Sequence, residues 1–223
     1  MECPKASLEW FKILQTDLPE DDEPWLMISV YAYKICSILP RIRRLMANCD
    51  DEEEFSLAAT ILAECDEMEA ETLTWMNSER VSSKSYPGNL PMLPIWNTYR
   101  CLRSKLHSSL LEFFGLLGKS QTRLFDHQTI LQRRQSSFAI VLDMADGIVN
   151  SIPYALGDPS TLEDNFKTTR PRSWSDALRL MWPLRVVSFS PLALPYQREI
   201  ANVALRQIGH EMGIGQALTQ LCR

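Results

Sequence analysis

Apolar residues recur along this chain with the 3.6-residue period of a helix, and the two-residue alternation of a strand is almost absent. The clearest stretches lie in the last third, where AIVLDMADGIVNSIPYALG, SDALRLMWPLRVV and REIANVALRQIGHEMGIGQA are separated by proline and glycine breaks. Each stretch predicts a helix with an apolar face that must be buried against other helices. We therefore expect an all-α fold, a single irregular multi-helix bundle of about six to eight helices.

The same spacing predicts three earlier helices, at 24–46, 52–75 and 95–117. Pro40 is expected to kink or break the first, Asp50 and Asp51 to cap the second, and Gly118 to end the third. Their apolar stripes are Ile28, Tyr31, Ile35, Leu39, Ile42 and Met46, then Ala58, Ile61, Leu62, Cys65, Met68, Thr72 and Trp75, and finally Ile95, Tyr99, Leu102, Leu106, Leu110, Phe113 and Leu117.

Prolines and glycines divide the rest of the chain. A fourth helix is expected from about residue 124 until Pro153 stops it. A further helix is expected to be interrupted at Pro183, and Pro195 is expected to open a last long helix that breaks within 209–215. We expect a lead-in segment at 1–23 and one helical domain at 24–223. Any internal seam should lie in loop 81–94, which holds three prolines.

Charge and cysteine spacing limit the classes of function. The net charge of −5 has the wrong sign for a DNA-binding surface, and the basic groups at 41–44 and 133–134 are interpreted as solvated helix faces. No secretory signal begins the chain, and no stretch approaches the ~20 uninterrupted apolar residues of a membrane span. We expect an intracellular protein whose cysteines are free thiols, because Cys3, Cys36, Cys49, Cys65, Cys101 and Cys222 form no CxxC pair.

No catalytic or metal-binding pattern stands out. Asp143 and Asp146 share a helix face, but a diphosphate-binding magnesium site also needs a second carboxylate cluster, and capping already explains Asp50 and Asp51. The three histidines are His107, His127 and His210. None has a His or Cys three or four residues away, and His210 is expected to interact with the carbonyls at a helix end. We assign no catalytic, cofactor-binding or metal-ligating residue, expect no cofactor, and predict that the chain is not an enzyme.

Four large apolar side chains lie on either side of Pro183, and they admit two interpretations: Trp174, Met181, Trp182 and Phe189. They are predicted to be core residues, because large apolar side chains at helical spacing usually pack inside. The alternative is that they line a pocket for an apolar ligand, which would then be the effector site.

Three motifs carry a resemblance to a known family: SIPYALG at 151–157, WPL at 182–184 and IGHEMGIGQA at 208–217. In this order they resemble the C-terminal end of the regulatory region of fungal binuclear zinc-cluster transcription factors. The acidic helix that ends in LTWMN at 73–77 is similar to the helix that commonly precedes them. The resemblance is loose from about Pro24 and specific only after Ala139. It implies an all-helical regulatory module.

The chain departs from that family in its DNA-binding part. It has no CxxC pair for the two-zinc cluster and no counterpart of the coiled coil that usually follows, so no zinc-ligating residue is carried over. The resemblance implies a nuclear regulator of a metabolic gene set. Such a protein would act through the transcription machinery, a full-length zinc-cluster factor or a small-molecule effector, without its own sequence-specific DNA contact.

Three alternatives to this interpretation stay open. The first is an accessory enzyme or small-molecule-binding protein that reuses the helical scaffold, with Asp143, His210 or Tyr196 as its polar groups. The second is a truncated gene product with no independent role. The third concerns location, which would be cytoplasmic instead of nuclear.

Overall fold

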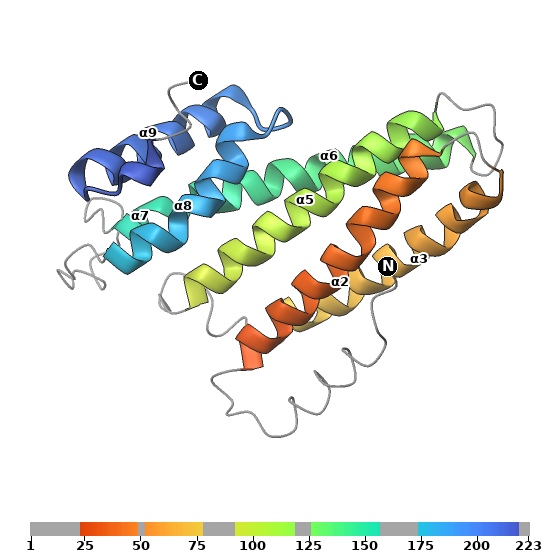
Figure 1. Ribbon diagram of the computed structural model, residues 1–223, viewed down its shortest axis with the longest axis horizontal. Helices are drawn as coiled ribbons and strands as arrows, with labels where there is room; N and C mark the ends of the chain where they lie inside the picture. The colour runs from red at the N-terminus through yellow and green to blue at the C-terminus, as the bar shows by residue number, and fades with distance from the viewer. Residues whose placement is uncertain (1–22, 49–51, 78–91, 119–125, 157–173, 219–223) are drawn as a thin grey trace. The chain divides into compact units, whose positions relative to one another are not determined.

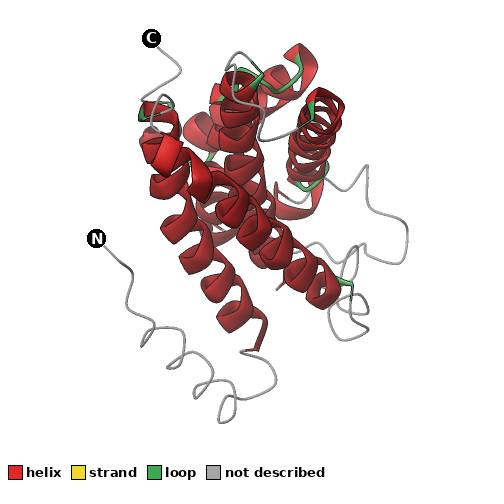
Figure 2. Ribbon diagram, turned by 90° about the vertical axis from the view of Figure 1, so that its right-hand side faces the viewer, coloured by secondary structure: helices red, strands yellow, loops and turns green. Residues whose placement is uncertain are grey.

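The computed structural model describes residues 23–48, 52–77, 92–118, 126–156 and 174–218. These residues form helices and short loops without any strand, as Figure 2 shows, which confirms the predicted all-α class. The elements in chain order (Figure 1) are α2 (Glu23–Ala47), α3 (Glu52–Met76), α5 (Leu93–Leu117), α6 (His127–Val149), α7 (Ile152–Leu156), α8 (Trp174–Phe189), α9 (Pro195–Glu211) and the 3₁₀ helix η3 (Gly215–Ala217). The lead-in at 1–22, the residues Asp50 and Asp51, and most of loop 81–94 lie outside the described residues.

The chain divides into two compact units. Unit 1 consists of 1–83 and 105–137, and unit 2 consists of 84–104 and 138–223. One boundary lies at 83/84, between α3 and α5. The other two boundaries fall within α5 and α6, so both helices contribute residues to both units.

Unit 1 contains α2 and α3, which pack side by side (Figure 1), together with the second half of α5 and the first half of α6. The predicted stripes of α2 and α3 face inward, with Leu39, Met46 and Trp75 only partly buried. Completely or almost completely buried side chains of unit 1 include Ile35, Ile42, Leu106, Phe113 and Phe114.

The acidic helix α3 forms ion pairs with basic residues that were interpreted as solvated helix faces. Arg41 of α2 donates two hydrogen bonds to Glu64, one of them 3.0 Å from Nη2 to Oε1, and this contact raises the pKa of Arg41. Arg133 of α6 donates to both carboxylate oxygens of Asp66, at 3.2 and 2.7 Å. Two-pronged pairs of this kind fix the geometry of neighbouring helices even where solvent screens their energy.

Unit 2 is built around the packing of α8 against α9, with α7 and η3 completing the arrangement. Pro195 is the first residue of α9, as predicted. The helix passes through Gly209 and ends at Glu211, after which Gly213 adopts a φ of 71°, a left-handed conformation that glycine reaches without steric cost. The helix was predicted to break within 209–215, and the break lies in the second half of that range, after Glu211.

Helix α2 runs through Pro40 without a break, and the alternative expectation of a kink there stays a prediction. Pro183 and Pro153 behave differently from the prediction. Helix α8 runs through Pro183 without interruption. The buried Pro183 is surrounded by apolar packing, which offsets the lost backbone hydrogen bond and keeps α8 continuous. Pro153 does not stop the fourth helix, because α6 already ends at Val149 and Pro153 lies inside the short helix α7.

The helical stretch His127–Leu156 is long and apolar enough to cross a membrane by length and composition, with a mean hydropathy of 1.2 in its most apolar window. Of that window, 44% is buried inside the protein. Core helices of soluble proteins meet the same criterion, so the stretch does not identify a membrane protein.

Candidate functional site

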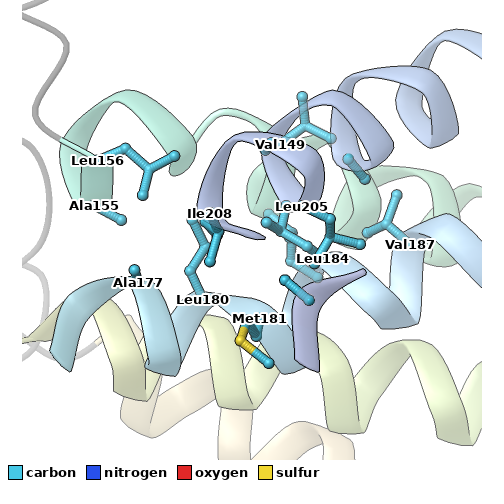
Figure 3. Close-up of a cluster of buried hydrophobic side chains, with 14 of the residues drawn as sticks. Val149, Ala155, Leu156, Ala177, Leu180, Met181, Leu184, Val187, Leu205 and Ile208 are labelled. Carbon is cyan, nitrogen blue, oxygen red and sulfur yellow. The ribbon is translucent and has the colours of Figure 1, made fainter. Parts of the chain in front are cut away.

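The three motifs of the C-terminal third meet in one buried cluster of unit 2. Figure 3 shows side chains of α7, α8 and α9 pointing toward one another in this cluster. Motif 151–157 contributes Ala155 and Leu156, motif 182–184 contributes Leu184, and motif 208–217 contributes Ile208 and other residues. The motifs therefore share one packing role, although 24 residues separate the first from the second and 23 separate the second from the third.

The first motif begins with a buried serine that holds a turn. The Ser151 hydroxyl donates to the backbone carbonyl of Ile148 at 2.6 Å and accepts from Asn97 Nδ2 at 2.9 Å. Arg100 in turn donates to Asn97 Oδ1 at 2.9 Å. This chain of hydrogen bonds satisfies a carbonyl at the end of α6, where helical partners run out. Ser151 therefore serves the turn between α6 and α7.

The third motif contains Gly209, which lies so close to a neighbouring side chain that a larger residue would clash with it. A Cβ at Gly209 would lie 2.5 Å from Cγ of Leu218, which is closer than such atoms can approach. Next to this contact, the Arg185 side chain donates a hydrogen bond to the backbone carbonyl of Gln216. Arg185 directly follows the second motif, so this bond ties α8 to η3.

Asp146, half of the aspartate pair considered as a metal site, is held by two residues of α9. It accepts hydrogen bonds from the Tyr196 hydroxyl at 2.7 Å and from Gln197 Nε2 at 2.8 Å. The bond to Asp146 raises the pKa of Tyr196. Gln197 is completely buried, and its Oε1 accepts from the backbone N–H of Leu194, which caps α9. No group of three His, Cys, Asp or Glu side chains able to hold a metal ion occurs in the described ranges.

Unit 1 contains a polar network that the sequence does not reveal. Each of its four helices contributes one side chain: Tyr31 from α2, Glu69 from α3, His107 from α5 and Ser137 from α6. The Tyr31 hydroxyl donates to Glu69 Oε1 at 2.7 Å. His107 lies between Glu69, 3.2 Å from Nε2, and Ser137, 3.2 Å from Nδ1. An imidazole protonated on Nε2 would donate to the carboxylate and accept from the serine.

The order of carboxylate, imidazole and hydroxyl is the order of a nucleophilic triad. The network differs from a nucleophilic triad in the solvent exposure of its side chains. Ser137 is 4% exposed and His107 is 7% exposed. Neither residue lines the hollow beside Tyr154 or the hollow beside His127. Both side chains are enclosed between helices, and the network links four helices to one another.

Each unit contains a hollow lined by described residues. A hollow of unit 2, beside Tyr154 and Asp176, measures about 20 Å³, which is room for about one water molecule. A hollow of unit 1 is open and measures about 490 Å³. Its lining combines apolar and charged side chains: Met46, Glu112, Gly115, Leu116, Gly118, His127, Ile130, Leu131 and Arg134. None of the polar groups Asp143, His210 and Tyr196 that were considered for a ligand site lies there.

The aromatic residues of α8 are neither core nor pocket, contrary to both interpretations of the sequence. Trp174, Trp182 and Phe189 are 58%, 45% and 51% exposed, and only Met181 is buried. The physical reason is that the apolar residues of α8 cover more of its circumference than the cluster buries. The sector from Val187 through Leu184 to Met181 packs into the cluster, and the three aromatic side chains lie in the sector next to it.

The remaining candidate residues lie apart from one another. His127 begins α6 at the rim of the 490 Å³ hollow, and the exposed His210 lies in the last turn of α9, where its expected role can be fulfilled. Cys36, Cys65 and Cys101 are free thiols. Burial raises the pKa of Cys65 to about 12 and raises that of Cys101 further, so neither is a nucleophile at neutral pH.

No family model, curated protein or solved structure matches the chain. The family resemblance thus rests on the three motifs themselves. Their residues meet in the cluster of unit 2 and serve turns and packing there.

Proposed function

We propose that this chain is a transcription-regulator-like protein that acts in the nucleus on a metabolic gene set by binding protein partners. It would correspond to the regulatory domain of a fungal binuclear zinc-cluster factor without the zinc cluster. The observation that supports the proposal is the convergence of the three motifs in one cluster, with Ser151, Gly209 and Arg185 in turn and packing roles. A module that receives and passes on a binding signal needs such a rigid frame and an exposed surface.

DNA contact would come from the partner. The chain is net negative, and Arg41 and Arg133 are paired with carboxylates of α3, which removes them from phosphate binding. The partner would be a component of the transcription machinery or a full-length zinc-cluster factor.

A reporter experiment tests this proposal. The full chain is fused to an unrelated sequence-specific DNA-binding domain, and expression of a reporter downstream of its site is measured in a fungal host. Expression should change relative to the DNA-binding domain alone. Equal expression from the two proteins, at matched abundance and with both located in the nucleus, would count against the proposal.

The open hollow of unit 1 favours a second candidate function, the binding of a small molecule. Its volume of about 490 Å³ lies within the range of ligand sites, and its lining offers apolar surface next to Glu112, His127 and Arg134. A side chain at Gly115 would extend into open space, because a Cβ there meets no atom within 4 Å. Gly115→Leu should therefore fill part of the hollow.

Native mass spectrometry of the chain purified from its source tests the second candidate. A bound small molecule should appear as added mass in the wild type and in Gly115→Ala, and should be lost in Gly115→Leu. Unliganded mass in all three proteins would reject this function. The reporter experiment does not depend on that result.

A further inference from the structure

Helices α8 and α9 are joined by the loop 190–194, which the structure describes completely. Its first two residues are Ser190 and Pro191. Ser190 is the only serine or threonine in the sequence that directly precedes a proline. A serine followed by proline is the local sequence that proline-directed protein kinases phosphorylate, and functional positions of this kind are concentrated in loops.

The proline has a physical role in this recognition. Its nitrogen carries no hydrogen, so a kinase can enclose the residue in an apolar pocket without burying an unpaired backbone donor. Any other residue at this position would bring an N–H group, which costs free energy when it is buried without a partner. Pro191 is exposed in the loop, where an enzyme can contact it.

The Ser190 hydroxyl is held weakly. Its oxygen accepts a hydrogen bond from the backbone N–H of Leu192 at 3.3 Å, which is longer than the usual range of about 2.7–3.2 Å. The backbone N–H of Ser190 donates to the carbonyl of Val187 at 3.2 Å. Ser190 is partly exposed, and its neighbour Phe189 is 51% exposed. Drawing the serine out of the loop therefore breaks two long hydrogen bonds.

The nearby Ser188 provides a contrast within the same stretch of chain. It lies inside α8 and is followed by Phe189 instead of a proline. Its hydroxyl donates to Asn202 Oδ1 of α9 at 2.5 Å, a much shorter bond than the one at Ser190. Ser188 thus has neither the sequence nor the weakly held hydroxyl of Ser190.

A phosphate on Ser190 would lie directly after the last residue of α8. The carbonyl groups at the C-terminal end of a helix carry partial negative charge. A phosphoserine adds a charge of about −1.5 to −2 at neutral pH, which these carbonyls repel. Val187 of the last turn belongs to the buried cluster (Figure 3), so this repulsion acts on packed structure.

We propose that Ser190 is a phosphorylation site for a proline-directed protein kinase, and that the phosphate loosens the end of α8. In the reaction, the Ser190 hydroxyl oxygen attacks the γ-phosphorus of ATP. The bond between that phosphorus and the β–γ bridging oxygen breaks, and ADP leaves. The hydroxyl proton passes to the catalytic aspartate of the kinase. This site does not depend on the function proposed above.

Phosphorylation of the full chain by a mitogen-activated protein kinase and ATP, followed by intact-mass and peptide mass spectrometry, tests the site. The wild type should gain a single phosphoryl group on Ser190, and Ser190→Ala should gain none. Pro191→Ala keeps the hydroxyl but adds an N–H, and should lower kcat/KM by roughly tenfold or more. Ser188→Ala is the matched control and should be phosphorylated like the wild type.

Two further measurements complete the test. Far-ultraviolet circular dichroism should give the same helix content for all variants, which separates loss of the site from loss of fold. The phosphorylated wild type should melt about 1–4 °C below the unmodified protein. The chain purified from its source with phosphatase inhibitors, across growth phases, should carry phosphate on Ser190.

Several results would overturn the proposal. They are an unmodified wild type, in the kinase reaction or from the source, a phosphorylated Ser190→Ala, equal rates for the wild type and Pro191→Ala, and loss of phosphorylation in a folded Ser188→Ala. An unchanged melting temperature after complete phosphorylation would refute the loosening of α8.

Discussion

Replacing Gly209 with alanine gives a direct measure of how tightly the third motif is packed. A new Cβ would lie 2.5 Å from Cγ and 2.6 Å from Cδ2 of Leu218. Since Cγ is the branch point of the leucine, the whole side chain must move to relieve the contact. Gly115 of α5 is the matched control, because a Cβ there meets nothing within 4 Å. Both positions lie inside helices.

The two substitutions should have opposite signs. Alanine in place of glycine inside a helix stabilises by about 0.5–1 kcal/mol, and Gly115→Ala should show this gain alone. At Gly209 the same gain is opposed by overpacking, which typically costs about 1–3 kcal/mol. We expect Gly209→Ala to lower the free energy of unfolding by about 1–2 kcal/mol. In a protein of this size, each kcal/mol moves the melting temperature by about 2–4 °C.

Thermal and urea unfolding, followed by circular dichroism at 222 nm, should resolve both changes. Leu218→Ala removes the obstructing side chain, so Gly209→Ala should cost less in that background than in the wild type, a coupling that a double-mutant cycle measures. The reasoning is refuted if Gly209→Ala is as stable as the wild type, or if the two effects simply add.

Four further predictions concern buried polar groups and thiols. Gln197→Leu should lower the free energy of unfolding by about 1–3 kcal/mol, because the completely buried Gln197 amide makes three hydrogen bonds to partly buried groups and all three are lost. The exposed bond of Gln207 makes Gln207→Leu on the same helix the control, with a change within about 0.5 kcal/mol in urea unfolding. Glu69→Leu should cost about 1–3 kcal/mol in the same assay, because it removes the carboxylate that is hydrogen-bonded to the buried Tyr31 hydroxyl and His107 imidazole; a neutral result would exclude the network. Iodoacetamide at pH 8 should label Cys36 and leave Cys65 unmodified by mass spectrometry. Since the folded-state pKa of Cys65 is raised from 9.0 to about 12, its contribution to stability should be present below pH 9 and be lost between pH 9 and 12, and Cys65→Ala should flatten that decline.

The helices of this chain could be predicted from periodicity because burial of one face dictates the spacing of apolar residues. Where α8 continues through Pro183, periodicity and the local rule for proline gave opposite answers. The buried packing decided the outcome, and packing is a tertiary quantity. The exposure of Trp182 was missed for a related reason. A helix whose apolar residues cover more of its circumference than the core buries does not indicate from sequence which of them face the interior.

The polar network of unit 1 could not be predicted from sequence. His107 meets Glu69 from 38 residues away and Ser137 from 30 residues away. Such pairs depend on the relative register of three helices, about which a single sequence carries no signal. Burial of the polar residues His107 and Ser137 became visible only in the structure.

The same network has a consequence for how unit 1 selects its fold. Apolar helix faces can slide along one another by a turn and still bury similar area. A slip of one turn, about 5.4 Å, would carry the buried His107 imidazole out of hydrogen-bond reach of the Glu69 carboxylate. The hydrogen bonds of the network form in one register of the four helices. Tyr31, Glu69, His107 and Ser137 therefore fix that register, which apolar contacts alone leave open.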